Sequence, residues 1–175
     1  MSEPGAIAWF REPTPTPDDP HAGGTLNVAF QLLDRAVVAG ASDETLLKDE
    51  GGEISHATLL ELVAAFGGVL RGFGVVPGDR VAVELAAGQD AVVALLAVSR
   101  IGAAAVTVPV GIPEPELVHI ISATRPRVVV TANAEAMAGV LAQCDHRPGA
   151  VVATGARAPD SDAVPWDVVI RAGRT

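Results

Sequence analysis

The sequence predicts an α/β fold with a mostly parallel sheet flanked by helices. Short Val- and Ala-rich runs alternate with helix-like segments from residue 80 to residue 153. Such alternation is typical of parallel strands joined by crossover helices. Hydrophobic residues make up 49% of the 175 residues and charged residues 19%, which is enough apolar material for a packed core and too much for a disordered chain.

The chain is predicted to have three parts. Residues 1–25 are rich in proline, so we expect an extended arm there, with Trp9 and Phe10 as apolar anchors. Residues 26–154 are predicted to form the α/β subdomain. Residues 155–175 are predicted to form a C-terminal extension, which is polar except for an apolar patch that includes Trp166.

The first half of the subdomain is predicted to hold two helices and a hairpin. Apolar residues recur at helical spacing from Leu26 to Val37. Residues 45–48 and 53–55 are strand-like and flank a glycine-containing turn, so they predict a hairpin. Ser55 is placed to cap a second helix, whose apolar stripe continues to Phe73.

The second half is predicted to alternate strictly between strands and helices. Pro77 and Gly78 suit the two central positions of a type II turn before the first strand. The helix over residues 91–101 is apolar nearly all round, so we expect it to be buried. The strands are predicted at residues 80–85, 104–108, 127–131 and 150–153, and the helices at 91–101, from Pro113 onward and at 134–143.

Charge and composition exclude several classes of function. The net charge is −9 and aromatic residues are only 3% of the chain, so a nucleic-acid partner is not expected. A polybasic membrane patch is excluded by the same acidity, and the apolar run at residues 91–97 is too short to span a bilayer. The single cysteine, Cys144, fits a protein of the reducing cytoplasm.

The sequence contains no recognisable set of catalytic or metal-ligating residues. The four histidines have no metal-ligand spacing; they are His21, His56, His119 and His146. The Gly72-Phe73-Gly74 string follows a helix and not a strand, which is the wrong context for a dinucleotide-binding loop. No G-x-x-x-x-G-K-[ST] phosphate loop is present. We therefore predict no catalytic residue and no metal site.

Several strings occur in the same order as in one enzyme family. They are residues 26–35 (LNVAFQLLDR), 74–82 (GVVPGDRVA), 91–103 (AVVALLAVSRIGA), 113–117 (PEPEL) and 125–131 (RPRVVVT). This ordered set resembles the N-terminal region of acetyl- and propionyl-CoA synthetases, within the adenylate-forming, AMP-binding ligases. The Trp9-Phe10 pair also fits that family, and residues 164–167 (VPWD) resemble a segment shortly before its phosphate loop. The resemblance implies the N-terminal subdomain of the adenylate-forming ligase fold.

The resemblance also implies a reaction. In this family a carboxylate attacks ATP in the presence of Mg²⁺ to give an acyl-adenylate, and coenzyme A (CoA) then displaces AMP. The family's phosphate loop, ribose-binding aspartate and lid lysine have no counterparts in this sequence. We therefore expect no cofactor to be bound by this chain alone, and no activity without a complementary C-terminal catalytic part.

Two departures from the family pattern concern CoA. The family's CoA-binding arginines fall on Met137 and Val140, which cannot hold a phosphate. The family's Phe-Gly-Gly, which lines the pantetheine channel, falls on Pro109-Val110-Gly111, so only Gly111 is kept. The resemblance makes Gly111 a candidate CoA-channel residue, and a simple turn after a strand is the competing interpretation.

Three interpretations stay open on the sequence alone. The first is the N-terminal part of an acyl-CoA synthetase, and the second is a stand-alone, non-catalytic interaction module with the same fold. The third is an unrelated small nucleotide-binding domain. Sheet edges and apolar surface that a larger enzyme would cover also predict self-association of the chain.

Overall fold

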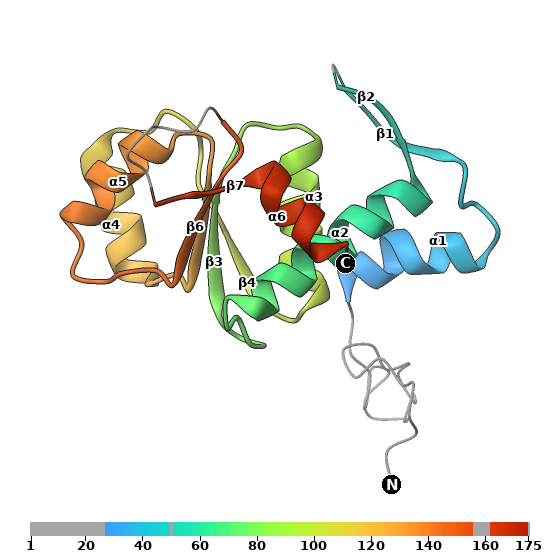
Figure 1. The fold of residues 1–175 in the computed structure, drawn as a ribbon, viewed down its shortest axis with the longest axis horizontal. Helices are drawn as coiled ribbons and strands as arrows, with labels where there is room; N and C mark the ends of the chain where they lie inside the picture. The colour runs from blue at the N-terminus through green and yellow to red at the C-terminus, as the bar shows by residue number, and fades with distance from the viewer. Residues whose placement is uncertain (1–26, 50, 156–161, 175) are drawn as a thin grey trace, which may run out of the picture.

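The computed structural model describes residues 27–49, 51–155 and 162–174. In this part of the chain a five-stranded sheet lies between two groups of helices, and a hairpin projects from one end (Figure 1). The predicted N-terminal arm, with Trp9 and Phe10, lies outside the described residues, as does His21. No helix in the described ranges combines the length and apolarity that crossing a bilayer requires.

The five-stranded sheet confirms the predicted α/β class. Its order is β4-β3-β5-β6-β7, and every neighbouring pair is parallel. Its strands are β3 (Arg80–Glu84), β4 (Ala104–Thr107), β5 (Val128–Thr131), β6 (Ala150–Ala153) and β7 (Val164–Pro165). The first four match the predicted runs to within a residue, whereas β7 is too short to leave a pattern in the sequence.

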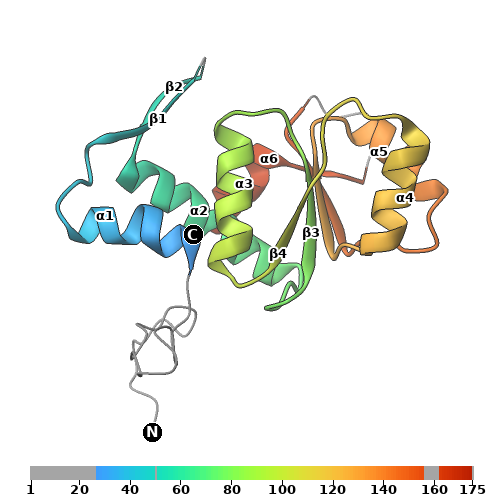
Figure 2. The same cartoon turned by 180° about the vertical axis from the view of Figure 1, so that it is seen from behind.

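Side chains of successive strand residues point to opposite faces of the sheet, and helices bury both faces. One face packs against α2 (His56–Gly72), α3 (Gln89–Arg100) and α6 (Trp166–Gly173). The other packs against α4 (Glu114–Thr124) and α5 (Ala134–Ala142). Figures 1 and 2 show the two layers on either side of the sheet. This two-sided cover is what an all-parallel sheet requires.

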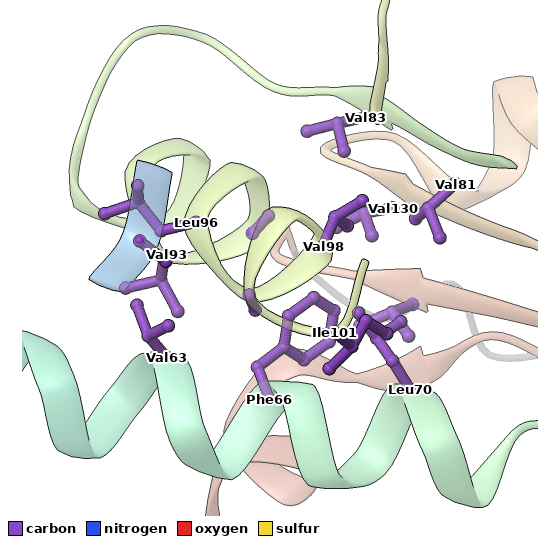
Figure 3. Close-up of a cluster of buried hydrophobic side chains, with 14 of the residues drawn as sticks. Val63, Phe66, Leu70, Val81, Val83, Val93, Leu96, Val98, Ile101 and Val130 are labelled. Atoms are coloured by element: carbon purple, nitrogen blue, oxygen red, sulfur yellow. The ribbon is translucent and has the colours of Figure 1, made fainter. Parts of the chain in front are cut away.

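The larger core lies between α2, α3 and the sheet. Phe66 and Leu70 of α2 are fully buried there, beside Ile101 at the end of α3 (Figure 3). The ring of Trp166 lies against Phe66 with the two centroids 4.7 Å apart. Burial of each large apolar side chain contributes about 1.5–3 kcal/mol. The predicted apolar patch around Trp166 is therefore the start of a helix, α6, that packs on α2.

The predicted N-terminal helix is present over residues 28–38, but it contains a π-helical turn that was not predicted. A five-residue π-helical turn, η1 (Phe30–Asp34), precedes a short α1 (Arg35–Val38). This segment is fixed to the end of α3 by polar contacts. The side-chain amide of Asn27 donates a hydrogen bond to the backbone carbonyl of Ser99 at 3.0 Å. Arg100 donates to both carboxylate oxygens of Asp34, at 2.5 and 2.8 Å, in a bidentate and largely buried pair.

The predicted hairpin, cap and turn are confirmed. The hairpin consists of antiparallel β1 (Thr45–Asp49) and β2 (Gly52–Ser55). The Ser55 hydroxyl accepts a hydrogen bond from the Thr58 amide at 3.3 Å and so caps α2. Gly78 has φ +88°, the left-handed conformation that the third position of a type II turn needs.

A glycine substitution tests the packing of α6 on α2. A Cβ added to Gly173 would lie 2.2 Å from the Ala65 carbonyl oxygen, and this backbone atom cannot rotate away. We expect Gly173→Ala to lower the free energy of unfolding by about 1–3 kcal/mol, because overpacking displaces the helix. Urea denaturation measures this change.

The matched control is Gly139→Ala in α5, where the added Cβ meets no atom within 4 Å. There alanine replaces glycine in a helix without a clash, so we expect a gain of about 0.5–1 kcal/mol. Equal effects of the two substitutions would show that α6 does not pack tightly on α2.

Candidate functional site

The candidate site lies where the carboxyl ends of the strands meet. The chain leaves β3 for α3 on one face of the sheet and leaves the adjacent β5 for α5 on the other face. Diverging connections of this kind open a crevice at the edge of a parallel sheet, which is the usual ligand position in such folds. A cavity of about 350 Å³ lies there, lined by Asp49, Gly51, Leu85, Ala86, Gly88, Gln89, Asp90, Ala132 and Thr154. We call this cavity the polar crevice.

Asp49 of the hairpin closes one side of the polar crevice. Its carboxylate accepts hydrogen bonds from the backbone amide of Gln89 and from the Gln89 side chain, both at 2.9 Å. It also accepts one from the Gly51 amide at 2.8 Å. The N-cap residue of α3 is Gly88, which has no side chain. Asp49 therefore supplies the cap from another element and places a negative charge at the positive end of α3.

Thr131 joins the ends of two strands beneath the crevice. Its hydroxyl is fully buried and donates to the Glu84 carboxylate at 2.6 Å. The same hydroxyl accepts from the Asn133 amide at 3.0 Å. The Asn133 side chain in turn accepts from the Ala136 amide at 3.0 Å and caps α5. These bonds fix the relative positions of β3, β5 and α5.

Asp90 brings a second carboxylate to the polar crevice. Partial burial raises the pKa of this carboxyl above its ordinary value of 3.8, and the nearby Asp49 charge adds to the increase. A hydrogen bond from the Trp166 side chain acts in the opposite direction and lowers the pKa. Burial is the largest of these effects. The crevice therefore disfavours additional negative charge.

A second, apolar hollow lies on the other side of β3. It has a volume of about 260 Å³ and is lined by Val83, Leu85, Ala91, Leu95, Thr107, Val108 and Pro109. The Pro109-Val110-Gly111 turn follows directly. Gly111 has φ +80°, and a Cβ there would meet no atom within 4 Å. The backbone conformation alone accounts for glycine at this position, and its place beside a CoA channel stays a prediction.

The two positions that the resemblance aligns with CoA-binding arginines are not on the surface. Met137 and Val140 are 1% and 2% exposed, and both pack in the core beneath α4 and α5. Neither cavity is lined by a lysine or an arginine, within the described residues. These two cavities thus offer walls for a ligand but no cation in their linings to hold a phosphate.

The three described histidines do not gather at a site. His56 contacts the Glu44 carbonyl through Nδ1 at 3.1 Å, and His146 contacts the Pro126 carbonyl through Nε2 at 2.7 Å. His119 is exposed on α4. Cys144 is buried and its thiol donates to the Val140 carbonyl at 3.3 Å. No group of metal-ligating side chains forms in the described ranges.

The residues that shape the polar crevice are not predictable from local sequence. The sequence predicts Asp49 in the hairpin turn, whereas in the structure it ends β1 and its partner Gln89 is 40 positions away in the chain. One signal was present, because Gly88 precedes an apolar helix without a capping side chain. A helix start of that kind calls for a capping group from elsewhere.

Replacement of Asp90 tests its raised pKa. The folded chain holds this proton more tightly than the unfolded chain does, so stability falls as pH rises from 3.8 through the folded-state pKa. Asp90→Asn removes this penalty, and its amide oxygen still accepts the Trp166 hydrogen bond. We expect a higher Tm than wild type at pH 7 and a smaller difference near about pH 4. Asp43→Asn in an exposed loop is the control. A Tm difference that is independent of pH would contradict the assignment.

Replacement of Asp49 tests the link between the hairpin and α3. Asp49→Ala removes three hydrogen-bond acceptor contacts, and we expect a loss of about 1–2 kcal/mol in unfolding free energy with faster amide exchange in β1 and β2. Asp49→Asn keeps one acceptor oxygen and should lose less. Unchanged exchange in the hairpin of the alanine variant would show that other contacts hold it.

Comparison with known proteins assigns a family to this arrangement. The sequence profile described as "AMP-binding enzyme" matches residues 33–171. The chain is 36% identical over 139 residues to the acetyl-coenzyme A synthetase of Streptomyces coelicolor. It is 31% identical over 137 residues to the chloroplastic/glyoxysomal acetyl-coenzyme A synthetase of Arabidopsis thaliana. These matches cover 73% and 75% of the chain but only 21% and 17% of the two relatives.

Solved structures share the fold. The anthranilate CoA ligase AuaEII, in complex with anthranoyl-AMP, superposes with a TM-score of 0.73 at 19% identity, over 82% of this chain and 27% of that one. A benzoate CoA ligase from Burkholderia xenovorans gives 0.69 at 20% identity, over 84% and 28%. The chain thus spans about a fifth of the length of the curated relatives named here. Because the family profile matches residues 33–171, which is more than half of the chain, the chain belongs to the AMP-binding enzyme family of adenylate-forming ligases.

Proposed function

We propose that this chain is the N-terminal part of an acyl-CoA synthetase, which joins a carboxylate to CoA through an acyl-adenylate with ATP and Mg²⁺. The observation that carries the proposal is the continuous match of residues 33–171 to the AMP-binding family. That range includes every strand of the five-stranded sheet and both cavities. The resemblance to short-chain acyl-CoA synthetases thus involves the whole subdomain and not one motif.

In this proposal the chain supplies walls of the substrate site but no positive charge in them. The polar crevice and the apolar hollow form one wall of the substrate site, and the Gly111 turn borders the path of the pantetheine arm. Adenylate formation needs cations at the phosphates, because electrostatic stabilisation is the largest contribution to such chemistry. The described cavity walls hold carboxylates and no lysine or arginine. We infer that the chain alone does not activate a carboxylate.

The missing groups would come from a complementary C-terminal catalytic part. That part would bring the phosphate loop, the ribose-binding aspartate and the lid lysine that the family uses. We place this chain in the cytoplasm, since its single cysteine is buried and fits a reducing compartment.

One observation favours a second candidate function, a non-catalytic interaction module. Met137 and Val140 are core residues at the positions where the family carries CoA-binding arginines. An arginine at either position would bury an unpaired charge, which costs several kcal/mol. Loss of CoA binding would suit a chain that kept the fold for another partner.

A chimera separates the two functions. Residues 33–171 of this chain would replace the matching segment of the Streptomyces coelicolor acetyl-coenzyme A synthetase. The synthetase proposal predicts acetate-dependent pyrophosphate release above background, with CoA capture reduced through a raised KM for CoA. The module alternative predicts a folded but inactive chimera.

A substitution in the chimera tests the candidate CoA-channel residue. Gly111→Val forces a branched side chain to φ +80° and should lower kcat/KM for CoA by about tenfold.

Calorimetry on the isolated chain tests the absence of phosphate-binding groups. Titration with ATP-Mg²⁺ and with CoA should give no binding at micromolar concentration, because no described cation lines either cavity. Micromolar binding of ATP would contradict both functions above and favour a small nucleotide-binding domain.

A further inference from the structure

The outer edge of β4 leaves backbone groups without a strand partner. Among the described strands, β4 pairs with β3 and is the last strand on its side of the sheet. The amide of Ala104 donates to the Asp79 carbonyl at 2.7 Å and that of Val108 to the Val83 carbonyl at 2.9 Å. Backbone groups alternate along a strand, so those of Ala105 and Thr107 face the open edge. Figure 2 shows β4 with no element in front of it.

Within the described residues, this edge lacks the features that normally protect an edge strand. Edge strands are usually shielded by charged side chains, a proline, a bulge or a covering element. Residues 101–113 contain no charged side chain, and Pro109 follows β4 rather than interrupting it. The opposite edge differs, because β7 has two residues, ends in Pro165 and leads into α6 on α2. Among the described elements, the β7 edge is therefore protected and the β4 edge is not.

The side chains of β4 also lack cover. Strands of parallel sheets are normally buried on both faces and are continuously apolar in sequence. The β4 sequence, Ala-Ala-Val-Thr, follows that pattern. Yet Ala104, Ala105 and Thr107 are exposed and Val106 is only half-buried. The sequence is that of an interior strand, and the structure places it at the surface.

We propose that β4 pairs with β4 of a second copy of this chain, antiparallel across a two-fold axis at Val106. In this register Ala105 lies opposite Thr107 of the other copy, and each outward amide and carbonyl finds a partner. The two Val106 side chains meet as the non-hydrogen-bonded pair, where side chains approach most closely. The two sheets become one continuous sheet.

The charge distribution favours a second copy of this chain as the partner and the β4 edge as the contact surface. Each copy has a net charge of −9, so two copies repel unless they meet on a neutral surface. Residues 101–113 form such a surface, and the identical strands are complementary to each other by symmetry. The dimer does not depend on the proposed enzymatic function.

Sedimentation velocity over a micromolar concentration series tests the dimer. Ala105→Pro removes an outward amide and keeps the amides of Ala104, Val106 and Val108 that face β3. We expect the dimer dissociation constant to rise at least roughly tenfold. Ala105→Val keeps the amide and is the matched control, which should remain dimeric. Far-UV circular dichroism establishes that each variant is folded.

Thr107→Lys is the second variant, because proline can also unfold a strand. It lowers the net negative charge of the chain, so repulsion between whole molecules would predict tighter association. The edge interface predicts weaker association, since the added charge lies beside Ala105 of the other copy. Leu32→Lys, at an exposed apolar position on η1, tests the alternative face and should remain dimeric.

Concentration-dependent dimerisation that both edge variants weaken, and both controls keep, supports the proposal. A wild-type chain that is monomeric throughout the series overturns it. A dimer lost in Leu32→Lys and kept in Thr107→Lys also overturns it, and so does a chain that associates only when the C-terminal catalytic part is added.

Discussion

Burial of both faces of the parallel sheet is the constraint on which the rest of this structure depends. Val81, Val83 and Val130 face one helical layer, and Ala82 and Val129 face the other. The connections must therefore divide between two sides, with α3 on one and α5 on the other. Because they diverge at the carboxyl ends of β3 and β5, the polar crevice opens there. The position of the candidate site is thus a consequence of core packing.

Contacts between elements distant in the sequence then determine what this crevice can hold. The hairpin brings the Asp49 carboxylate to the start of α3, where an anion would otherwise bind. Asp90 adds a second carboxylate beside α6. Met137 and Val140 turn inward to complete the core instead of outward toward a phosphate. The chain has the fold of its family, and the two cavities described above are lined by no lysine or arginine.

Local signals made most of the fold predictable. The helix cap joins Ser55 and Thr58, which are only three residues apart. The turn at Gly78 depends on the positive φ of that one residue. Such interactions need no knowledge of tertiary structure. In contrast, β7 and α6 form because Trp166 packs on Phe66, 100 positions earlier in the chain. The π-helical turn at Phe30–Asp34 places Asp34 against Arg100, which is 66 positions away. No window of sequence contains both partners of these contacts.

The sequence by itself determined the fold class, the strands β3 to β6 and the family, because apolar periodicity and ordered strings are properties of contiguous residues. The tertiary structure alone decided where the crevice lies, which carboxylates line it and which sheet edge stays open. Ala104–Thr107 shows the difference most clearly. Its composition is that of a buried strand, and only the strand order places it at the edge. Strand order depends on which helices pack on each face of the sheet. The distribution of the helices between the two faces is a property of the whole chain.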